Sequence, residues 1–163
     1  MADAEDLYLR FGPGLYKYAL ALLANRAAAE DVIQQVFLAI LKWPDLQMRS
    51  EVDYLRQAVR NECYSVARRI AAAPKESPLL EDIGDGGVDH VERIALEKCL
   101  RELPIEQREA VHFHVFEGLT FQQIGERIGA SPNTVSARYR YALGKMRQSL
   151  IAPRAGESAL NGK

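Results

Sequence analysis

The feature that most constrains this chain is a tight break, Gly-Ala-Ser-Pro, between two amphipathic patterns in its last third. Ser131 can accept hydrogen bonds from the first free amides of a helix, and Pro132 fits the first helical position, where no donor is needed. Upstream, Thr120 and Gln123 have the spacing of a capping box, and Gly129 suits the end of that helix. We therefore expect two short helices that meet at an angle, the second beginning at Ser131.

The second of these helices has two contrasting faces. Five apolar residues recur at helical spacing and predict a buried stripe: Val135, Tyr139, Ala142, Met146 and Leu150. The opposite face consists of Thr134, Ala137, Arg138, Tyr141 and Lys145, with Arg140 and Arg147 beside it. Because residues 131–154 include no acid, this face suits phosphates and base edges. The pattern indicates a DNA-binding helix-turn-helix, and a plain solvated face is the alternative.

Charge is unevenly distributed along the chain. The net charge is −1, yet residues 76–92 contain six acids and neither Lys nor Arg, whereas residues 131–154 contain five bases. Residues 48–75 are also basic, with six bases against three acids. The acidic stretch contains a proline and three glycines, which predicts a flexible linker between two basic surfaces. This linker could compete with DNA for those surfaces, or it could simply be solvated.

These shifts in composition predict the organisation of the chain. With 163 residues, of which 48% are hydrophobic, it can bury one ordinary core or two small ones. We expect an all-α fold of two small helical domains joined by a flexible acidic linker, the C-terminal domain being a helix-turn-helix. The expected ranges are a helical domain over 1–73, the linker over 74–91, the helix-turn-helix domain over 92–151, and a disordered polar tail over 152–163 with no sensory domain after it.

Several classes of protein are disfavoured by the composition. No apolar run approaches the length that spans a bilayer, and the N-terminus is acidic where a secretory signal would be basic and then apolar. We expect a cytoplasmic protein that does not bind membranes. Cys63 and Cys99 lie singly in amphipathic patterns, so neither a disulfide framework nor a zinc site is indicated. We expect no metal and no cofactor.

A helix is predicted from about residue 28 to residue 43, where Pro44 stops it. Its expected buried side chains are Ile33, Val36, Phe37, Ile40 and Leu41. The opposite face is polar with one apolar residue in its middle, and it consists of Asp31, Gln34, Gln35, Leu38 and Lys42. Such a face could dock a partner helix, although a solvent face is the simpler interpretation.

The next predicted helix begins with Ser50 and Asp53 as capping residues. Its expected buried stripe is Val52, Leu55, Val59, Cys63, Val66 and Ile70. The opposite face holds Gln57, Arg60, Asn61, Tyr64 and Arg68. An aromatic ring between two arginines suits single-stranded DNA, because guanidinium groups bind phosphates and an unstacked base can rest on the ring. A tyrosine half-buried at a domain edge is an equal alternative.

Three segments of the chain together resemble a known family. They are "AEDVIQQVFLAIL" at 29–41, "YLRQAVRNECYSVARR" at 54–69, and the region 103–150 that contains the helix-turn-helix. In this order, with an acidic linker between the second and third, they resemble the bacterial RNA polymerase sigma factors, in particular the small two-domain extracytoplasmic-function group. The resemblance covers about residues 7–150.

The resemblance implies partners and roles. The first segment would bind core RNA polymerase through Asp31, Gln34, Gln35 and Leu38. The second would bind the minus-ten promoter element and stabilise unstacked single-stranded bases through Arg60, Asn61, Tyr64, Arg68 and Arg69. The third would bind the minus-thirty-five duplex through Ser131, Asn133, Thr134, Ala137, Arg138, Arg140, Tyr141 and Lys145. Polymerase would perform the chemistry, and family habit suggests an anti-sigma partner, which no residue identifies.

The chain departs from the family pattern at several positions. Gln35 stands where Glu is common, Tyr54 where Trp is frequent, and Ser65 where Asp is frequent. Ser136 and Ala137 replace a frequent Lys-Ser pair, so fewer direct DNA donors remain. These departures bear on promoter sequence, on melting efficiency and on affinity for polymerase, and they leave the expected fold unchanged.

Two other classes of protein were weighed against this interpretation. A helix-turn-helix regulator, acting as repressor or activator without stable polymerase binding, would need an N-terminal receiver of alternating strands and helices, and nothing before Glu92 is predicted as a strand. An enzyme would have its best candidate site at His112 and His114. Residues two apart on a helix point to nearly opposite faces, so this pair cannot share a metal or a substrate. We expect one of these histidines to be packed and the other exposed.

Overall fold

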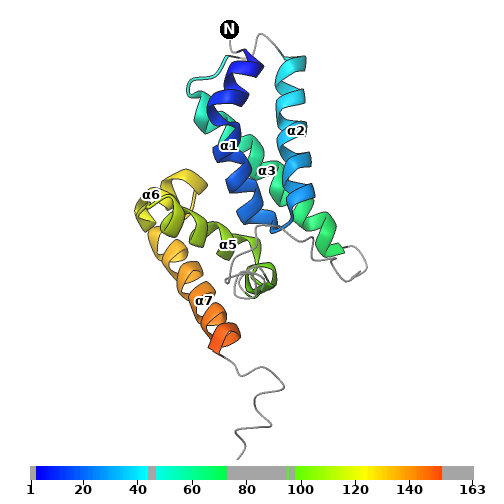
Figure 1. Cartoon of the computed structure of the whole chain (residues 1–163). Helices are drawn as coiled ribbons and strands as arrows, with labels where there is room; N and C mark the ends of the chain where they lie inside the picture. The colour runs from blue at the N-terminus through cyan, green and yellow to red at the C-terminus, as the bar shows by residue number, and fades with distance from the viewer. Residues whose placement is uncertain (1–2, 44–46, 73–94, 96–97, 152–163) are drawn as a thin grey trace, which may run out of the picture. The chain divides into compact units, whose positions relative to one another are not determined.

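The computed structural model describes residues 3–43, 47–72, 95 and 98–151, and all regular structure within these ranges is helical. This confirms the predicted all-α fold. The chain divides into two compact units, Met1–Glu81 and Asp82–Lys163 (Figure 1). The predicted linker over 74–91 and the predicted tail over 152–163 lie outside the described residues. None of the described helices is long and apolar enough to cross a bilayer.

The first unit begins with α1 (Ala4–Leu23), whose ends are set by local hydrogen bonds. The Asp3 carboxylate accepts from the Glu5 amide at 3.1 Å and caps the first turn. At the other end, Ala24 adopts the left-handed conformation (φ 50°), and its amide donates to the Leu20 carbonyl at 2.8 Å. The chain can therefore turn back within two residues and begin the next helix.

Two further helices complete this unit. α2 (Arg26–Lys42) begins two residues before the predicted start, because the Asn25 side chain caps it by accepting from the Ala28 amide at 2.9 Å. α3 (Glu51–Ala72) begins after Ser50, whose hydroxyl accepts from the Asp53 amide at 3.4 Å. The predicted stop signal, Pro44, lies outside the described residues.

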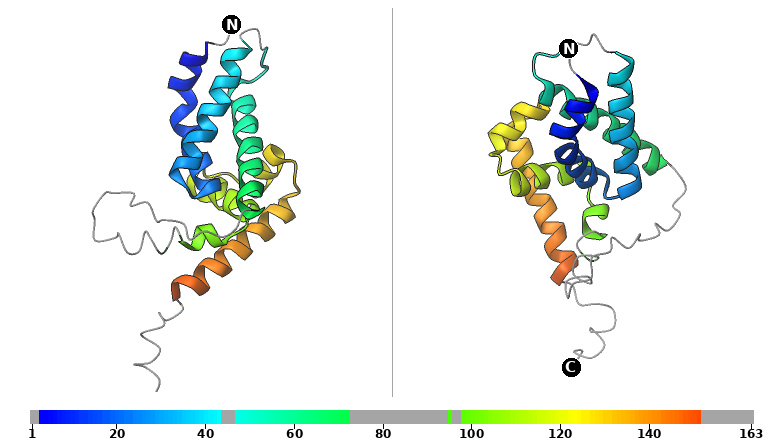
Figure 2. Two further views of the ribbon diagram at one scale, coloured as in Figure 1. Left: turned by 90° about the vertical axis from the view of Figure 1, so that its right-hand side faces the viewer. Right: turned by 45° about the horizontal axis from the view of Figure 1, so that its top comes forward.

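The three helices form one small bundle in which every pair is in contact (Figures 1 and 2). α1 and α2 run antiparallel, and α3 crosses them (Figure 1). The largest fully buried side chains come from all three helices and include Leu7, Leu22, Val32, Leu55 and Val59. The core is therefore built from one stripe of each helix.

An ion pair network joins the start of α1 to the start of α3. The Arg10 guanidinium donates to the Glu51 carboxylate at 2.7 Å and to the Asp6 carboxylate at 2.8 Å. These hydrogen bonds, the one with Glu51 first, raise the pKa of Arg10 above its ordinary value. Because all three side chains are substantially exposed, the network orients the helix ends more than it stabilises the fold.

Two residues that the sequence pattern placed in the core are exposed. Leu41 is 62% exposed. Val32, which the predicted stripe did not include, is buried. Leu41 follows buried Ile40 by one position, so it lies past the edge of the stripe. Ile70 is 55% exposed because it lies seven residues beyond Cys63, the last buried residue of α3. Val52 and Val66 are only half-buried.

The second unit contains α5 (Ile105–Val111), the π-helical turn η1 (His112–Phe116), α6 (Phe121–Ile128) and α7 (Pro132–Ile151). Residues 98–102 before them are also helical. A buried cluster of Leu103, Val111 and Ala142, with Leu100, Tyr139 and Met146 packed against it, links these helices. Val135 and Ala142 are buried and Tyr139 and Met146 are half-buried, as predicted for α7, whereas the Leu150 side chain lies outside the described part.

The predicted capping of the helix-turn-helix is confirmed. Thr120 and Gln123 form a reciprocal capping box, in which the Thr120 hydroxyl accepts from the Gln123 amide at 3.1 Å and the Gln123 side chain accepts from the Thr120 amide at 2.9 Å. Gly129 ends α6 in the left-handed conformation at φ 73°. The Ser131 hydroxyl accepts from the Thr134 amide at 3.1 Å at the start of α7.

The turn also depends on a glycine that the sequence analysis did not identify. The amides of Gly129 and Ala130 both donate to the Gly125 carbonyl, at 2.9 and 3.0 Å. The chain folds back so closely that a Cβ atom on Gly125 would lie 2.3 Å from the Ala130 carbonyl oxygen. Backbone cannot yield as a flexible side chain does, so only glycine fits here.

We expect Gly125→Ala to destabilise the second unit by about 1–3 kcal/mol, because the added methyl group forces the turn apart. Gly144→Ala is the matched control, since no heavy atom lies within 4 Å of its Cβ position in the interior of α7. It should be neutral or stabilising by up to about 1 kcal/mol. Urea unfolding followed by circular dichroism measures both changes, and equal stability of the two variants would contradict the close approach.

Candidate functional site

The outer face of α7 brings together most of the predicted DNA-binding residues of the second unit. Ala137, Arg140, Tyr141 and Lys145 are exposed and line a shallow hollow, together with Gly144 and Gln148. Arg138 is half-buried beside them. The Tyr141 ring is 67% exposed between these cations. The face therefore offers positive charge and one aromatic surface.

The charge of this face is not neutralised within the described residues. No acid there forms an ion pair with Arg138, Arg140 or Lys145, and α7 itself contains no acid. By contrast, Arg127 of α6 pairs with Glu117 at 3.3 Å. The positive potential is thus concentrated on α7 and not on α6, as a phosphate-binding surface requires.

The start of α7 holds the remaining predicted contacts. Ser131, Asn133 and Thr134 are all exposed in the first turn, where free amides favour an anion. The Ser131 hydroxyl is also 2.9 Å from the Thr134 hydroxyl. Because these two side chains already bond to each other and to the helix end, Asn133 has the greater freedom to contact DNA.

The histidines next to α5 are placed differently from the prediction. His112 is buried at 7% exposure, and His114 is half-buried, so neither is the exposed member of the pair. The His114 ring stacks on Phe121 with centroids 4.6 Å apart, and its Nδ1 lies 2.8 Å from the Leu119 carbonyl oxygen. The error arose because this segment is a π-helical turn, in which the α-helical spacing does not apply. Both rings serve packing.

On α3, the predicted single-strand surface has two internal contacts. The Arg60 guanidinium carbon lies 4.3 Å from the centroid of the Tyr64 ring. The Gln57 side-chain amide donates to the Oδ1 atom of the Asn61 side chain at 2.8 Å. Tyr64 is half-buried, whereas Asn61 and Arg68 are exposed. These residues share one face of α3 and lie within about three turns of one another.

Arg69 stands apart from this face. Its guanidinium lies 3.4 Å from the Glu62 carboxylate, and both residues line a hollow with Asp31 and Gln35 of α2. The bond to Glu62 partly neutralises the charge that was predicted to meet DNA. The contacts of Arg69 are therefore with Glu62 and with the hollow beside α2, and not with the face that holds Tyr64.

The predicted partner-binding face of α2 is exposed throughout. Asp31, Gln34, Gln35 and Leu38 are all accessible, and Leu38 is 50% exposed although it is apolar. An apolar side chain surrounded by polar ones on a helix surface suits a contact with another protein.

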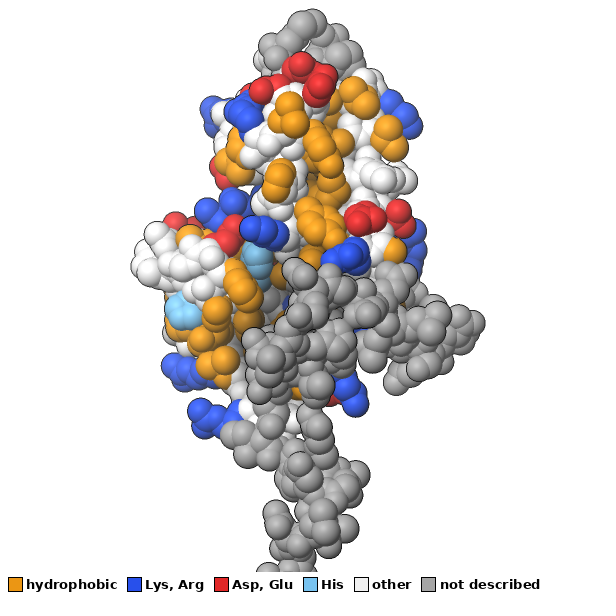
Figure 3. All heavy atoms as spheres, viewed as in Figure 1, with side chains coloured by type: hydrophobic (Ala, Val, Ile, Leu, Met, Phe, Trp, Pro, Cys, Tyr) orange, Lys and Arg blue, Asp and Glu red, His pale blue; other side chains and the backbone are white. Residues whose placement is uncertain are grey.

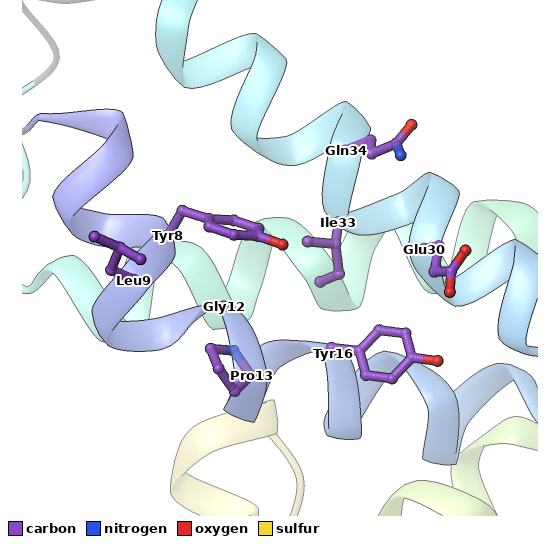
Figure 4. Close-up of a pocket in the computed structure, with 8 residues that line it drawn as sticks. All are labelled: Tyr8, Leu9, Gly12, Pro13, Tyr16, Glu30, Ile33 and Gln34. Atoms are coloured by element: carbon purple, nitrogen blue, oxygen red, sulfur yellow. The ribbon is translucent and has the colours of Figure 1, made fainter.

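A groove between α1 and α2 borders this face and was missed by the sequence analysis. It has a volume of about 450 Å³, and Tyr8, Pro13 and Tyr16 of α1 face Glu30 and Gln34 of α2 across it (Figure 4). The Tyr8 ring packs edge-on against Phe37, at 5.2 Å between centroids. Figure 3 shows the apolar strip that follows the groove along the first unit.

Sequence signals for this groove existed. Pro13 has no amide hydrogen, so the Leu9 carbonyl cannot accept its usual bond within the helix. Two exposed residues beside it, Tyr8 and Leu9, are large and apolar. A proline inside a helix next to exposed apolar side chains is unusual for a solvent face, and it indicates a surface with a binding role.

Other chemistry is not indicated by the side chains that are described. No group of three His, Cys, Asp or Glu residues among them could hold a metal ion. Cys63 and Cys99 are both buried, as small core residues are.

Comparisons with known proteins agree with the two units. Residues 7–72 match the family Sigma-70 region 2, and residues 93–146 match Sigma-70, region 4. The RNA polymerase sigma factor CarQ of Myxococcus xanthus is 27% identical over 160 residues, which cover 90% of this chain and 88% of CarQ. The ECF RNA polymerase sigma factor SigK of Mycobacterium sp. (strain KMS) is 29% identical over 146 residues, with 82% and 76% covered.

A solved structure has the same fold. It is the sigma factor RpoE in complex with the anti-sigma factor NepR from Bartonella quintana, with a TM-score of 0.66 and 22% sequence identity. The superposition covers 92% of this chain and 98% of RpoE.

Proposed function

This chain belongs to the sigma-70 family of RNA polymerase sigma factors, in its extracytoplasmic-function group, and on that premise we propose how its surfaces direct transcription initiation. The observation behind the assignment is the presence of regions 2 and 4, in that order, in one chain. A helix-turn-helix regulator would leave the whole first unit without a role. The sigma factor binds core RNA polymerase, recognises promoter DNA and assists its opening, while polymerase performs the chemistry.

We place polymerase binding on α2 and its border with α1. Asp31, Gln34 and Gln35 would supply polar contacts around Leu38, whose apolar side chain would be buried on binding. The groove continues this surface, because Gln34 lies both on the predicted face and in the groove wall. Accessible tyrosines such as Tyr8, which is exposed, and Tyr16, which is half-buried, are typical anchors of a protein interface.

We place minus-ten recognition on the exposed face of α3. Arg60 and Arg68 would bind phosphates, Asn61 would meet a base edge, and the Tyr64 ring would stack with an unstacked base. Arg69 would contribute less, because Glu62 already engages it.

We place minus-thirty-five recognition on α7, inserted in a major groove. Arg138 and its neighbours Asn133, Thr134 and Ala137 would face base edges, whereas Arg140, Lys145 and Arg147 would meet phosphates. Tyr141, at 67% exposure, lies between these two groups and can contact the sugar-phosphate backbone.

A regulator of the anti-sigma class would act on the same surfaces. The structurally similar RpoE was solved with the anti-sigma factor NepR. A protein that covered the α2 face would exclude polymerase by occupying its contacts. We propose that the protein acts in the cytoplasm, where polymerase and promoter DNA are found.

The assignment is tested by mixing the purified chain with core polymerase. Size-exclusion chromatography should give a stable complex, and run-off transcription across a genomic fragment library should give discrete products that need the added chain. A chain that bound DNA but never comigrated with polymerase would instead be a regulator.

We expect Asp31→Arg combined with Leu38→Asp to lower the affinity for core polymerase, because the first change reverses a contact charge and the second buries a new one. Asp53→Arg is the control, since it reverses the charge of another exposed acid, on α3 and away from this face. Fluorescence anisotropy with labelled chain measures the affinities, and circular dichroism confirms folding. Equal binding by the double variant and the control would remove α2 from the interface.

We expect Arg138→Ala and Lys145→Ala to impair DNA binding in different ways. Arg138→Ala should cost about 1–3 kcal/mol and relax the preference at one or two base pairs of the upstream element, because a planar donor can bond to a guanine edge. Lys145→Ala should weaken all sequences alike and reduce the salt slope by about one. Anisotropy with singly substituted duplexes at three salt concentrations separates the two. An even loss over all duplexes for Arg138→Ala would make it a phosphate contact.

A further inference from the structure

The contact between Arg60 and Tyr64 has a geometric cause in the helix. Side chains of an α-helix lean toward its N-terminus, so the Tyr64 ring lies over the turn that contains Arg60. The guanidinium carbon is 4.3 Å from the ring centroid, a distance at which the two planar groups attract each other. The ring face that a nucleobase would use is thus already in contact with a cation.

The accessible area of this ring is limited. Tyr64 is half-buried, as is Arg60, so only part of the ring is open to solvent. A base and a guanidinium have similar planar shapes and both bind the face of an aromatic ring. The two groups therefore compete for one surface.

We propose that Arg60 covers the Tyr64 ring in the free protein and moves from the ring to a DNA phosphate when an unstacked base takes its place. This inference rests on the proposed function, in which Tyr64 meets such a base. The exchange keeps the cation partnered at both stages, first by the ring and then by the phosphate. Stacking of the base and binding of the backbone are thereby coupled in one step.

The coupling also disfavours binding to DNA that offers only a base or only a phosphate. A base without an adjacent phosphate at the position that Arg60 reaches would have to displace the guanidinium from the ring without supplying a phosphate for it. A phosphate in a closed duplex would attract Arg60 but supply no base for the ring. Only an opened strand satisfies both residues, so the pair favours single-stranded over double-stranded DNA.

Arg68 provides a matched control for this proposal. It lies four residues after Tyr64, as Arg60 lies four residues before it, and it bears the same charge. Arg68 is exposed, and among the cation–ring contacts of the described residues the Tyr64 ring is paired with Arg60. Arg60→Gln and Arg68→Gln each remove one charge from the same face, but only the first uncovers the ring.

The experiment uses the full chain in complex with core polymerase. The probe is a single strand from a promoter found by run-off transcription, with 2-aminopurine placed at successive positions, because this base loses fluorescence when it stacks. Lifetimes measured at saturating DNA give the ratio of stacked to unstacked probe. Measured at a salt concentration that screens the phosphate contacts, Arg60→Gln should raise this ratio about two- to fivefold because the ring is uncovered, whereas Arg68→Gln should not raise it.

A second measurement tests the transfer to phosphate. Each glutamine variant should reduce the salt slope of strand binding by about one, because each loses one phosphate contact. An unchanged slope for Arg60→Gln would overturn the transfer. A stacked ratio that falls in Arg60→Gln at the screening salt concentration would also overturn the proposal, because it would mean that the guanidinium supports the stacked base without a phosphate.

Tyr64→Ala separates this proposal from the assignment of the surface. It should abolish the stacking signal at the position where the wild-type chain shows it. If the signal persists in Tyr64→Ala, the placement of base stacking on Tyr64 fails, and the cover role of Arg60 fails with it. If Tyr64→Ala abolishes the signal while Arg60→Gln leaves it unaltered, the surface is correct and only the cover role is wrong.

Discussion

Each helix of the first unit buries one stripe of side chains, because its three helices enclose a small core. In α3 that stripe consists of Leu55, Val59 and Cys63, and the rest of the helix surface is at least partly accessible. The opposite stripes of α2, α3 and α7 are therefore available to partners along their length. A larger core, with further helices packed around it, would have covered these faces. The small size of the core is therefore what leaves them exposed to partners.

These exposed faces differ in the charges that they carry. α7 has no acid, so its face retains the full positive potential that a duplex requires. α3 mixes acids and bases, and because Glu62 pairs with Arg69, we propose the cations near Tyr64 as its main DNA contacts. α2 presents acid, amide and apolar groups, which suits a protein partner better than a nucleic acid. A net charge near zero thus conceals three surfaces with different chemistry.

The comparison of sequence and structure shows where periodicity is a safe guide. The capping box at Thr120 and the turn at Gly129 were predicted correctly, because these bonds join residues three or four positions apart. Periodicity failed for Leu41 and Ile70, since burial at the margin of a stripe depends on how far the neighbouring helices extend. It failed again at His114, which is half-buried and not exposed, because the segment is a π-helical turn that changes the direction of each side chain.

The sequence by itself determined the helices, their caps, the order of the family segments and the distribution of charge, because all of these depend on residues close together in the chain. Tertiary structure decided the rest. The return of the Ala130 carbonyl onto Gly125 and the groove of α1 and α2 beside Glu30 arise from the relative positions of helices and turns. The cover of Arg60 on Tyr64 depends on which rotamers remain once the helix is packed. Such contacts are set by orientation in space, and no local pattern of residues specifies that orientation.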